Sequence, residues 1–248
     1  SIMFGLATVA CLTLPKSRHH THRTGLGVAY HNLFDQLKGG FRVVRKSIPV
    51  RYGLAQLTMI WAVIGVVMVV VPAYTSQVLD LNLREVSRLI ILPIGVGMLL
   101  GGYVLHRARR QFGTRSVVAA SVLLAGAAVV ALGQVQLIAE WMQDVGIYGR
   151  NVDGARQLVT SVASTVLGFG VSIVMIASLT LIHEHTEPAV RGRIFGVLGM
   201  SVNAANTLPV ILAGTLTDLF SVTAGVTGVG VILLAWGALS PASARHAL

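Results

Sequence analysis

The chain contains six apolar stretches that are each long enough to cross a lipid bilayer. We place them at residues 52–73, 88–106, 116–138, 159–182, 194–216 and 221–239. A transmembrane helix needs roughly 20 predominantly apolar residues. Helices are expected because every backbone polar group must be satisfied inside lipid, and the sequence has no strand-length alternation. The sequence therefore predicts an all-α, polytopic membrane protein whose six-transmembrane-helix bundle covers residues 52–239.

The composition agrees with a membrane protein rather than a water-soluble one. Apolar residues make up 54% of the chain and charged residues only 11%, with a mean hydropathy of +0.76. Soluble domains carry roughly 25% charged residues. The net charge of +10 is spread over short connections without an aromatic platform, so the expected partner is the lipid bilayer and not nucleic acid. The single cysteine, Cys11, excludes a disulfide framework and a Cys-x-x-Cys metal site.

The basic residues between the spans alternate from one connection to the next. Fifteen of the 19 Lys and Arg residues lie on one set of alternate connections, and only Arg84, Arg88, Arg150 and Arg156 lie on the other. Cytoplasmic loops carry an excess of Lys and Arg. We therefore expect a multi-pass protein of the cell inner (plasma) membrane, with the basic connections and the tail at 240–248 in the cytoplasm.

The region before the first complete span predicts two further segments. Residues 1–14 form an apolar run too short to cross a bilayer, and we interpret it as the end of a truncated transmembrane helix. Residues 15–51 are expected to be a cytoplasmic linker with an amphipathic helix, because apolar residues recur at helical spacing between Leu33 and Val44. The linker also holds a small histidine cluster. A polar linker with chance histidines is favoured over a weak metal site, since no carboxylate or cysteine accompanies them, and we expect neither a metal nor a cofactor.

Polar side chains gather on one face of several spans. Small and hydroxyl residues share a face of the fourth span, where cavity lining and tight helix packing remain equal alternatives. Two asparagines lie near the middle of the fifth span, where they are costly unless paired or wetted. A binding site is slightly favoured there over an interhelical hydrogen-bond clamp. The candidate cavity residues are Gln56, Ser161, Thr165, Ser172, Asn203 and Asn206.

Two segments resemble motifs of a known family. The stretch from Gly102 to Arg115 is similar to the Gly-x-x-x-Asp-Arg-x-Gly-Arg loop of major facilitator superfamily transporters, although His106 stands where the family has Asp. The run from Pro188 to Gly196, followed by Leu208-Pro209 and Ala213-Gly214, resembles the macrolide and siderophore exporter branch of that superfamily. With the six spans, these segments resemble the C-terminal six-helix half of such a transporter.

The resemblance implies a secondary transporter that exports a small amphipathic or drug-like compound by alternating access. It also implies a partner, the N-terminal six-helix half. The expected cytoplasmic gate residues are Arg107, Arg110, Arg115, Arg191 and Arg193. The alternative is a non-transporting scaffold or assembly factor with the same fold, which the absence of a mid-span acidic residue and the imperfect loop motif favour. An enzyme is not expected, because no span offers a Ser-His-acid set, an HExxH motif or paired carboxylates.

Overall fold

The computed structural model describes residues 41, 44–45, 47–77, 83–146, 152–219 and 221–245. Within these ranges the regular structure is helical and contains no strand, as the sequence predicts. The elements are α3 (Ile48–Gln77), α4 (Leu83–Val86), the π-helix η1 (Ser87–Ile91), α5 (Leu92–Phe112), α6 (Thr114–Gly133), α7 (Val135–Asp144), α8 (Val152–Glu184), α9 (Pro188–Leu219) and α10 (Val222–Arg245). The segment expected at 1–14 and most of the linker expected at 15–51 lie outside the described residues.

Five stretches of these helices are long and apolar enough to cross a membrane. They are Ile48–Val69, Ser87–Phe112, Thr114–Gly133, Asp153–Glu184 and Val222–Leu239. The fifth predicted span, 194–216, lies within α9, which is 32 residues long but has described side chains only as far as Thr207. The described residues therefore belong to a multi-pass, helical membrane protein, and the sixth span stays a prediction.

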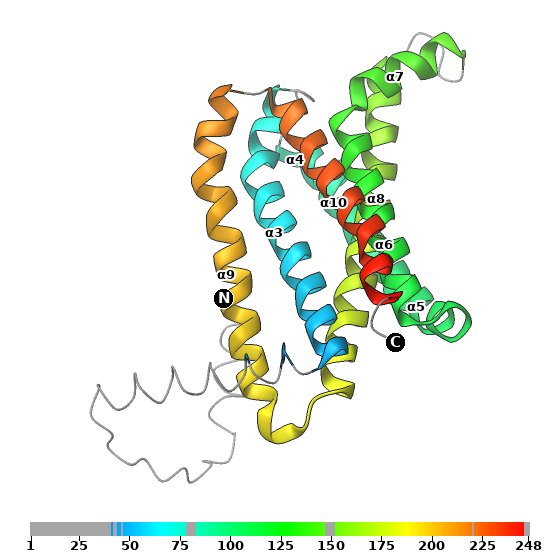
Figure 1. The fold of residues 1–248 in the computed structure, drawn as a ribbon. Coiled ribbons are helices and arrows are strands. Elements are labelled where there is room, and N and C mark those ends of the chain that lie inside the picture. The colour runs from blue at the N-terminus through cyan, green and yellow to red at the C-terminus, as the bar shows by residue number, and fades with distance from the viewer. Residues whose placement is uncertain are drawn as a thin grey trace, which may run out of the picture. The chain divides into compact units, whose positions relative to one another are not determined.

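Successive long helices run in opposite directions, so the connections collect at two ends of the bundle (Figure 1). The start of α3, the turn between α5 and α6, the turn between α8 and α9, and the end of α10 lie at one end. We call this the basic end, because it carries Arg51, Arg109 and Arg191. The alternation of Lys and Arg along the sequence thus corresponds to two opposite ends of the folded protein.

The predicted end of the third span is wrong. The third span does not continue to residue 138, because Gln134 leaves the helical conformation (φ −110°, ψ 23°) and separates α6 from the short helix α7. The side chain of Gln134 donates a hydrogen bond to the Thr227 hydroxyl on α10, 3.1 Å away, which holds the break in place. At the ends of the bundle, α3 begins at Ile48, before the predicted start at residue 52. α10 continues to Arg245, while its apolar stretch ends at Leu239, as predicted.

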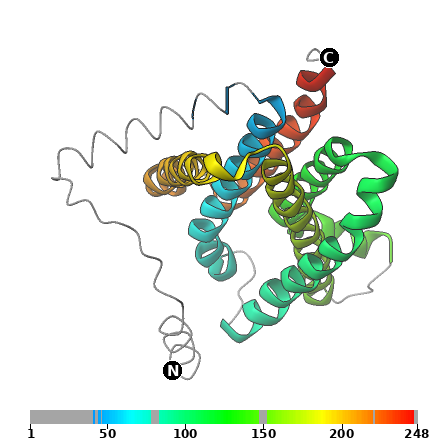
Figure 2. The same cartoon turned by 90° about the horizontal axis from the view of Figure 1, so that it is seen from below.

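The bundle core lies between α3, α5, α6, α8 and α10. Its most buried side chains include Ile60, Val118, Val122, Val174 and Leu233. α9 packs on the other side of α3, away from α5 and α6 (Figure 2). α9 is therefore a peripheral helix of the described bundle, with one side on α3 and another side free of the five core helices.

Glycines set the closest helix contacts. A Cβ atom added at Gly97 on α5 would lie 2.9 Å from the backbone nitrogen of Phe169 on α8, and one at Gly168 would overlap the backbone of Ile94. A Cβ atom at Gly230 on α10 would lie 2.7 Å from the backbone nitrogen of Val130 on α6. Small residues allow backbones in a membrane to approach closely, and packing then replaces the hydrophobic effect as the main attraction between helices.

Candidate functional site

The polar face of α8 is used for packing against α5 and η1. The Ser161 hydroxyl donates to the backbone oxygen of Leu89 in η1 at 3.4 Å, and the Thr165 hydroxyl donates to Ser161 O at 2.8 Å within α8. Ser172 is 3% exposed, and its hydroxyl donates to Phe169 O at 3.1 Å. A Cβ atom at Gly101 of α5 would overlap the Ser172 hydroxyl. Of the two interpretations that the sequence left open for this face, the structure places these residues in tight helix packing.

Gln56, one of the predicted cavity residues, is buried between helices. Its side chain is 1% exposed, in the interior of the bundle. The indole N–H of Trp236 on α10 donates to the Gln56 Oε1 atom at 3.2 Å. Gln56 therefore acts as an interhelical clamp between α3 and α10, because a buried amide must find partners inside the protein when water is excluded.

The two asparagines of α9 lie in different surroundings. Asn203 is exposed, and its Nδ2 group donates to Gly199 O at 2.8 Å within the same helix. Asn206 faces α3, where its side chain lies directly over Gly65. The Oδ1 atom of Asn206 is buried and has no hydrogen-bond partner among the described residues. The neighbouring Thr207 hydroxyl is exposed and donates to Asn203 O at 2.7 Å. α9 therefore presents an uncovered polar strip at Asn203 and Thr207.

An open groove of about 420 Å³ lies between α3, α9 and α10, toward the basic end. Apolar side chains line most of it, and Arg51, Thr58 and Ser201 supply polar groups. The Trp236 ring forms part of its wall, and behind that wall the same ring donates to Gln56. None of the six predicted cavity residues lines this groove.

The spacing of small residues on α3 and α9 was a sequence signal for this groove. The positions of the polar residues alone did not reveal it. On α3 the groove residues recur at intervals of three and four, and on α9 at intervals of four. This periodicity marks one face of each helix. Most of these residues are small, which leaves room between the helices. The recurring positions are Arg51, Ala55, Thr58 and Ala62 on α3, and Val197, Ser201 and Ala205 on α9.

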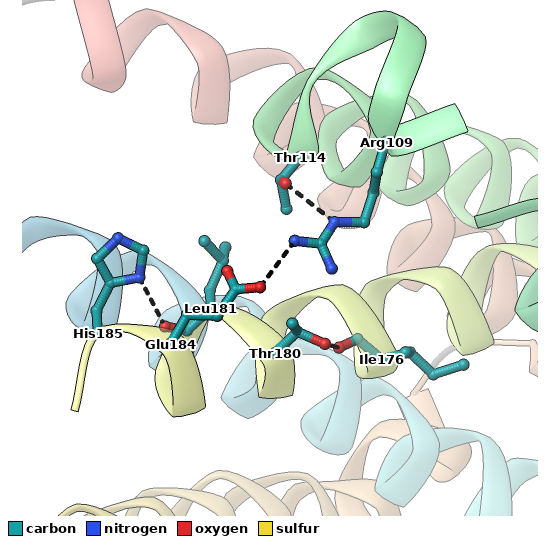
Figure 3. Close-up of polar contacts among 7 residues, drawn as sticks. All are labelled: Arg109, Thr114, Ile176, Thr180, Leu181, Glu184 and His185. Carbon is teal, nitrogen blue, oxygen red and sulfur yellow. Dashed lines mark hydrogen bonds and ion pairs between the residues drawn. The ribbon is translucent and has the colours of Figure 1, made fainter. Parts of the chain in front are cut away.

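At the basic end, Arg109 joins three helices through an ion pair and a hydrogen bond. The Arg109 guanidinium, near the end of α5, lies 3.3 Å from the Glu184 carboxylate at the end of α8. Its Nε atom also donates to the Thr114 hydroxyl at the start of α6, 3.2 Å away (Figure 3). Arg109 was not among the predicted gate residues. A signal for it was present, since Glu184 is one of few acidic residues on the basic connections.

The predicted gate arginines have several roles. Arg191, near the start of α9, donates to Thr186 O and to His183 O, each at 3.2 Å. These bonds satisfy one backbone oxygen in the last turn of α8, that of His183, and one in the connection to α9, that of Thr186. Arg115 is half-buried. The other three predicted gate residues, Arg107, Arg110 and Arg193, are exposed at the basic end.

Within the described part of the chain, no three His, Cys, Asp or Glu side chains lie close enough together to hold a metal ion. The histidine cluster at residues 19–22 lies outside the described residues. No protein-family model, no curated protein and no solved structure is significantly similar to this chain.

Proposed function

We propose that this chain is one six-helix half of a secondary transporter of the major facilitator type. The contacts among its long helices carry the proposal. The contact pattern is symmetric when α3 is exchanged with α8, α5 with α9, and α6 with α10. Under this exchange the contact α5–α8 becomes α9–α3, α6–α8 becomes α10–α3, and α5–α6 becomes α9–α10, and all of these contacts are present. The contacts α3–α8 and α6–α10 map onto themselves.

The two sets of three helices also have opposite directions. α3 begins at the basic end, whereas α8 begins at the other end (Figure 1). Three-plus-three repeats with inverted topology are the building plan of each half of a major facilitator transporter. A symmetric packing arrangement with inverted direction is expected of such repeats, and this supports the proposed fold.

The composition of the groove between α3, α9 and α10 supports the proposal that the substrate is a small amphipathic or drug-like compound. Its wall is mainly apolar, with a few polar groups at Arg51, Thr58 and Ser201. Binding sites for small molecules commonly have this composition, because apolar area gives affinity and a few polar groups fix orientation.

The proposed mechanism is alternating access against a second six-helix bundle. That bundle covers the polar strip of α9, so that Asn203 gains partners or lines a wet cavity instead of facing lipid. The Arg109–Glu184 pair and the bonds of Arg191 tie the basic end together on the cytoplasmic side of the plasma membrane. Efflux is the transport direction that we propose.

A transport measurement with a blocked groove tests the proposal. Cells that express the full-length protein are loaded with a fluorescent amphipathic dye, rhodamine 6G, and dye retention is compared with that of cells lacking the protein. We expect lower retention with the protein, and loss of the difference with Ala55→Trp, which fills the groove. Ala127→Trp is the matched control, because Ala127 is exposed on α6 and does not line the groove.

Two outcomes would contradict the proposal. Equal losses in both variants at equal expression would show that the groove is not the transport site. Unchanged retention in cells with the protein, repeated over a panel of cationic, neutral and anionic dyes, would favour the alternative of a non-transporting scaffold.

A further inference from the structure

A second groove opens between α5 and α8 at the basic end, on a different side of the bundle from the α3–α9–α10 groove. Its volume is about 460 Å³, and polar and apolar atoms contribute similarly to its wall. The residues that matter for its chemistry are Gly102, His106, Arg109, Arg110, Thr114 and Ile176. It shares no lining residue with the proposed substrate groove.

The part of the groove nearest the basic end is suited to an anion. His106 and Arg110 are exposed, and Arg109 reaches into the same space from α5. Arg109 uses its Nε and Nη2 groups for Thr114 and Glu184 (Figure 3). Within the described part of the chain, this leaves the Nη1 group of Arg109 for a further acceptor. Guanidinium groups bind phosphate oxygens with strong, charge-assisted hydrogen bonds.

The part of the groove farther from the basic end is apolar and belongs to the membrane-spanning region. Gly102 lies inside the apolar stretch Ser87–Phe112. α5 and α8 touch tightly at Gly101, but at Gly102 an added Cβ atom would meet only Ile176 Cδ1, at 3.5 Å. The helix surface beside this opening is apolar and uncovered, since Leu99 and Tyr103 are 77% and 75% exposed.

The two parts together match an amphipathic anion that reaches the groove sideways from the bilayer. A free phosphate would use only the basic part and would leave the apolar opening at Gly102 without a partner. Basic pockets between transmembrane helices on the cytoplasmic side bind the headgroups of anionic lipids. We propose that this groove is a binding site for an anionic phospholipid. Its phosphate lies among His106, Arg109 and Arg110, and an acyl chain lies over Gly102 and Ile176.

Native mass spectrometry of the purified, delipidated full-length protein tests the site. Phosphatidylglycerol is titrated against the protein, with phosphatidylcholine as the zwitterionic comparison. We expect the unmodified protein to bind one phosphatidylglycerol molecule more tightly than phosphatidylcholine. The affinity for phosphatidylglycerol should be about tenfold lower in His106→Gln/Arg110→Gln, because two polar contacts to the phosphate are lost. The matched control is Arg107→Gln/Arg193→Gln, which removes two exposed charges from the basic end but none from the groove wall.

A third variant tests the apolar part without changing any charge. Gly102→Phe fills the opening beside Ile176, and the ordinary distance at the Cβ position lets the helices keep their packing. It is expected to lower phosphatidylglycerol affinity severalfold and to leave binding of soluble glycerol phosphate unchanged.

Three outcomes would overturn the proposal. Equal loss of affinity in the groove and control double variants would show unspecific attraction to a basic surface. Full competition by glycerol phosphate, together with no effect of Gly102→Phe, would show a site for free phosphate. Equal affinity for phosphatidylcholine would show that the groove does not select an anion. Each readout is a binding affinity, so the result is independent of whether the protein transports anything.

Discussion

The indole N–H of Trp236 on α10 donates to the Gln56 Oε1 atom on α3, at 3.2 Å. Gln56 is almost completely buried, whereas the Trp236 side chain is 37% exposed and lies along the α3–α9–α10 groove. The hydrogen bond therefore holds the Trp236 ring in the groove wall, although Gln56 itself does not line the groove. Gln56 is in this sense a positioning residue behind the proposed substrate groove.

Replacing Trp236 with Phe removes this donor and keeps an aromatic ring in the wall. We expect the free energy of unfolding to fall by about 0.5–1.5 kcal/mol, the usual range for a polar interaction between membrane helices. The measurement is unfolding in mixed detergent micelles, followed by circular dichroism. Trp141→Phe serves as the control, because Trp141 is 60% exposed on α7. A Trp236→Phe protein as stable as this control would contradict the role of the bond.

Gly97 and Gly95 on α5 form a matched pair for testing the α5–α8 contact. A Cβ atom at Gly97 would overlap the backbone of α8, whereas a Cβ atom at Gly95 would have no atom within 4 Å. Gly97→Ala is expected to destabilise the protein by about 1–3 kcal/mol, the usual effect of overpacking. Gly95→Ala is expected to be neutral or slightly stabilising, since Ala favours helix more than Gly. The same unfolding measurement applies, and equal stabilities of the two variants would contradict the tight contact.

The sequence predicted the helices well, because the requirement for internal hydrogen bonding in lipid acts on each span separately. It did not predict the break at Gln134, since the apolar run continues through Val135 and Ile138. The bond that accompanies the break joins Gln134 to Thr227, which is 93 residues away in the sequence. A contact of this kind leaves no mark on local hydropathy.

The roles of the polar residues were harder to predict for the same reason. The positions of Ser161, Thr165 and Ser172 show that they share a face of α8, but not which helix covers that face. α5 covers it, and the hint was the pair Gly97 and Gly101, one turn apart on the second span. Gln56 was predicted to line a cavity because it is the polar residue on its face of the first span, and its partner Trp236 is 180 residues away in the sequence. The pattern of residues along a helix shows which side chains share a face, but it does not show which other helix packs against that face.

Gly113 makes the turn between α5 and α6 with a single residue outside the helices. Its backbone has φ 75° and ψ 151°, a conformation that is open to glycine and costly for other residues. Gly113→Ala is expected to lower the free energy of unfolding by about 1–3 kcal/mol through backbone strain. Gly192→Ala is the control, because Gly192 is helical and a Cβ atom there meets nothing within 4 Å. Hydrogen exchange at residues 109–117 would show whether the loss comes from the turn.

The Arg109–Glu184 pair is expected to contribute little to stability. The two side chains are 26% and 50% exposed, and partly exposed ion pairs contribute about 0.2–1 kcal/mol. A double-mutant cycle with Arg109→Gln and Glu184→Gln should give a coupling energy in this range, which decreases as salt is added. A coupling energy several times larger, or one independent of salt, would show that the pair is shielded from water.

The orientation in the membrane is tested by labelling single cysteines with a membrane-impermeant maleimide. In a Cys11→Ser background, Gln111→Cys probes the basic end and Asp144→Cys probes the other end, and both side chains are exposed. Because basic loops are retained in the cytoplasm, we expect labelling of intact cells at position 144 and not at position 111. Both positions should react after the membrane is permeabilised, which controls for reactivity. The reverse pattern in intact cells would place the basic end outside the cytoplasm and would exclude Arg109, Arg191 and the lipid groove from the cytoplasmic side.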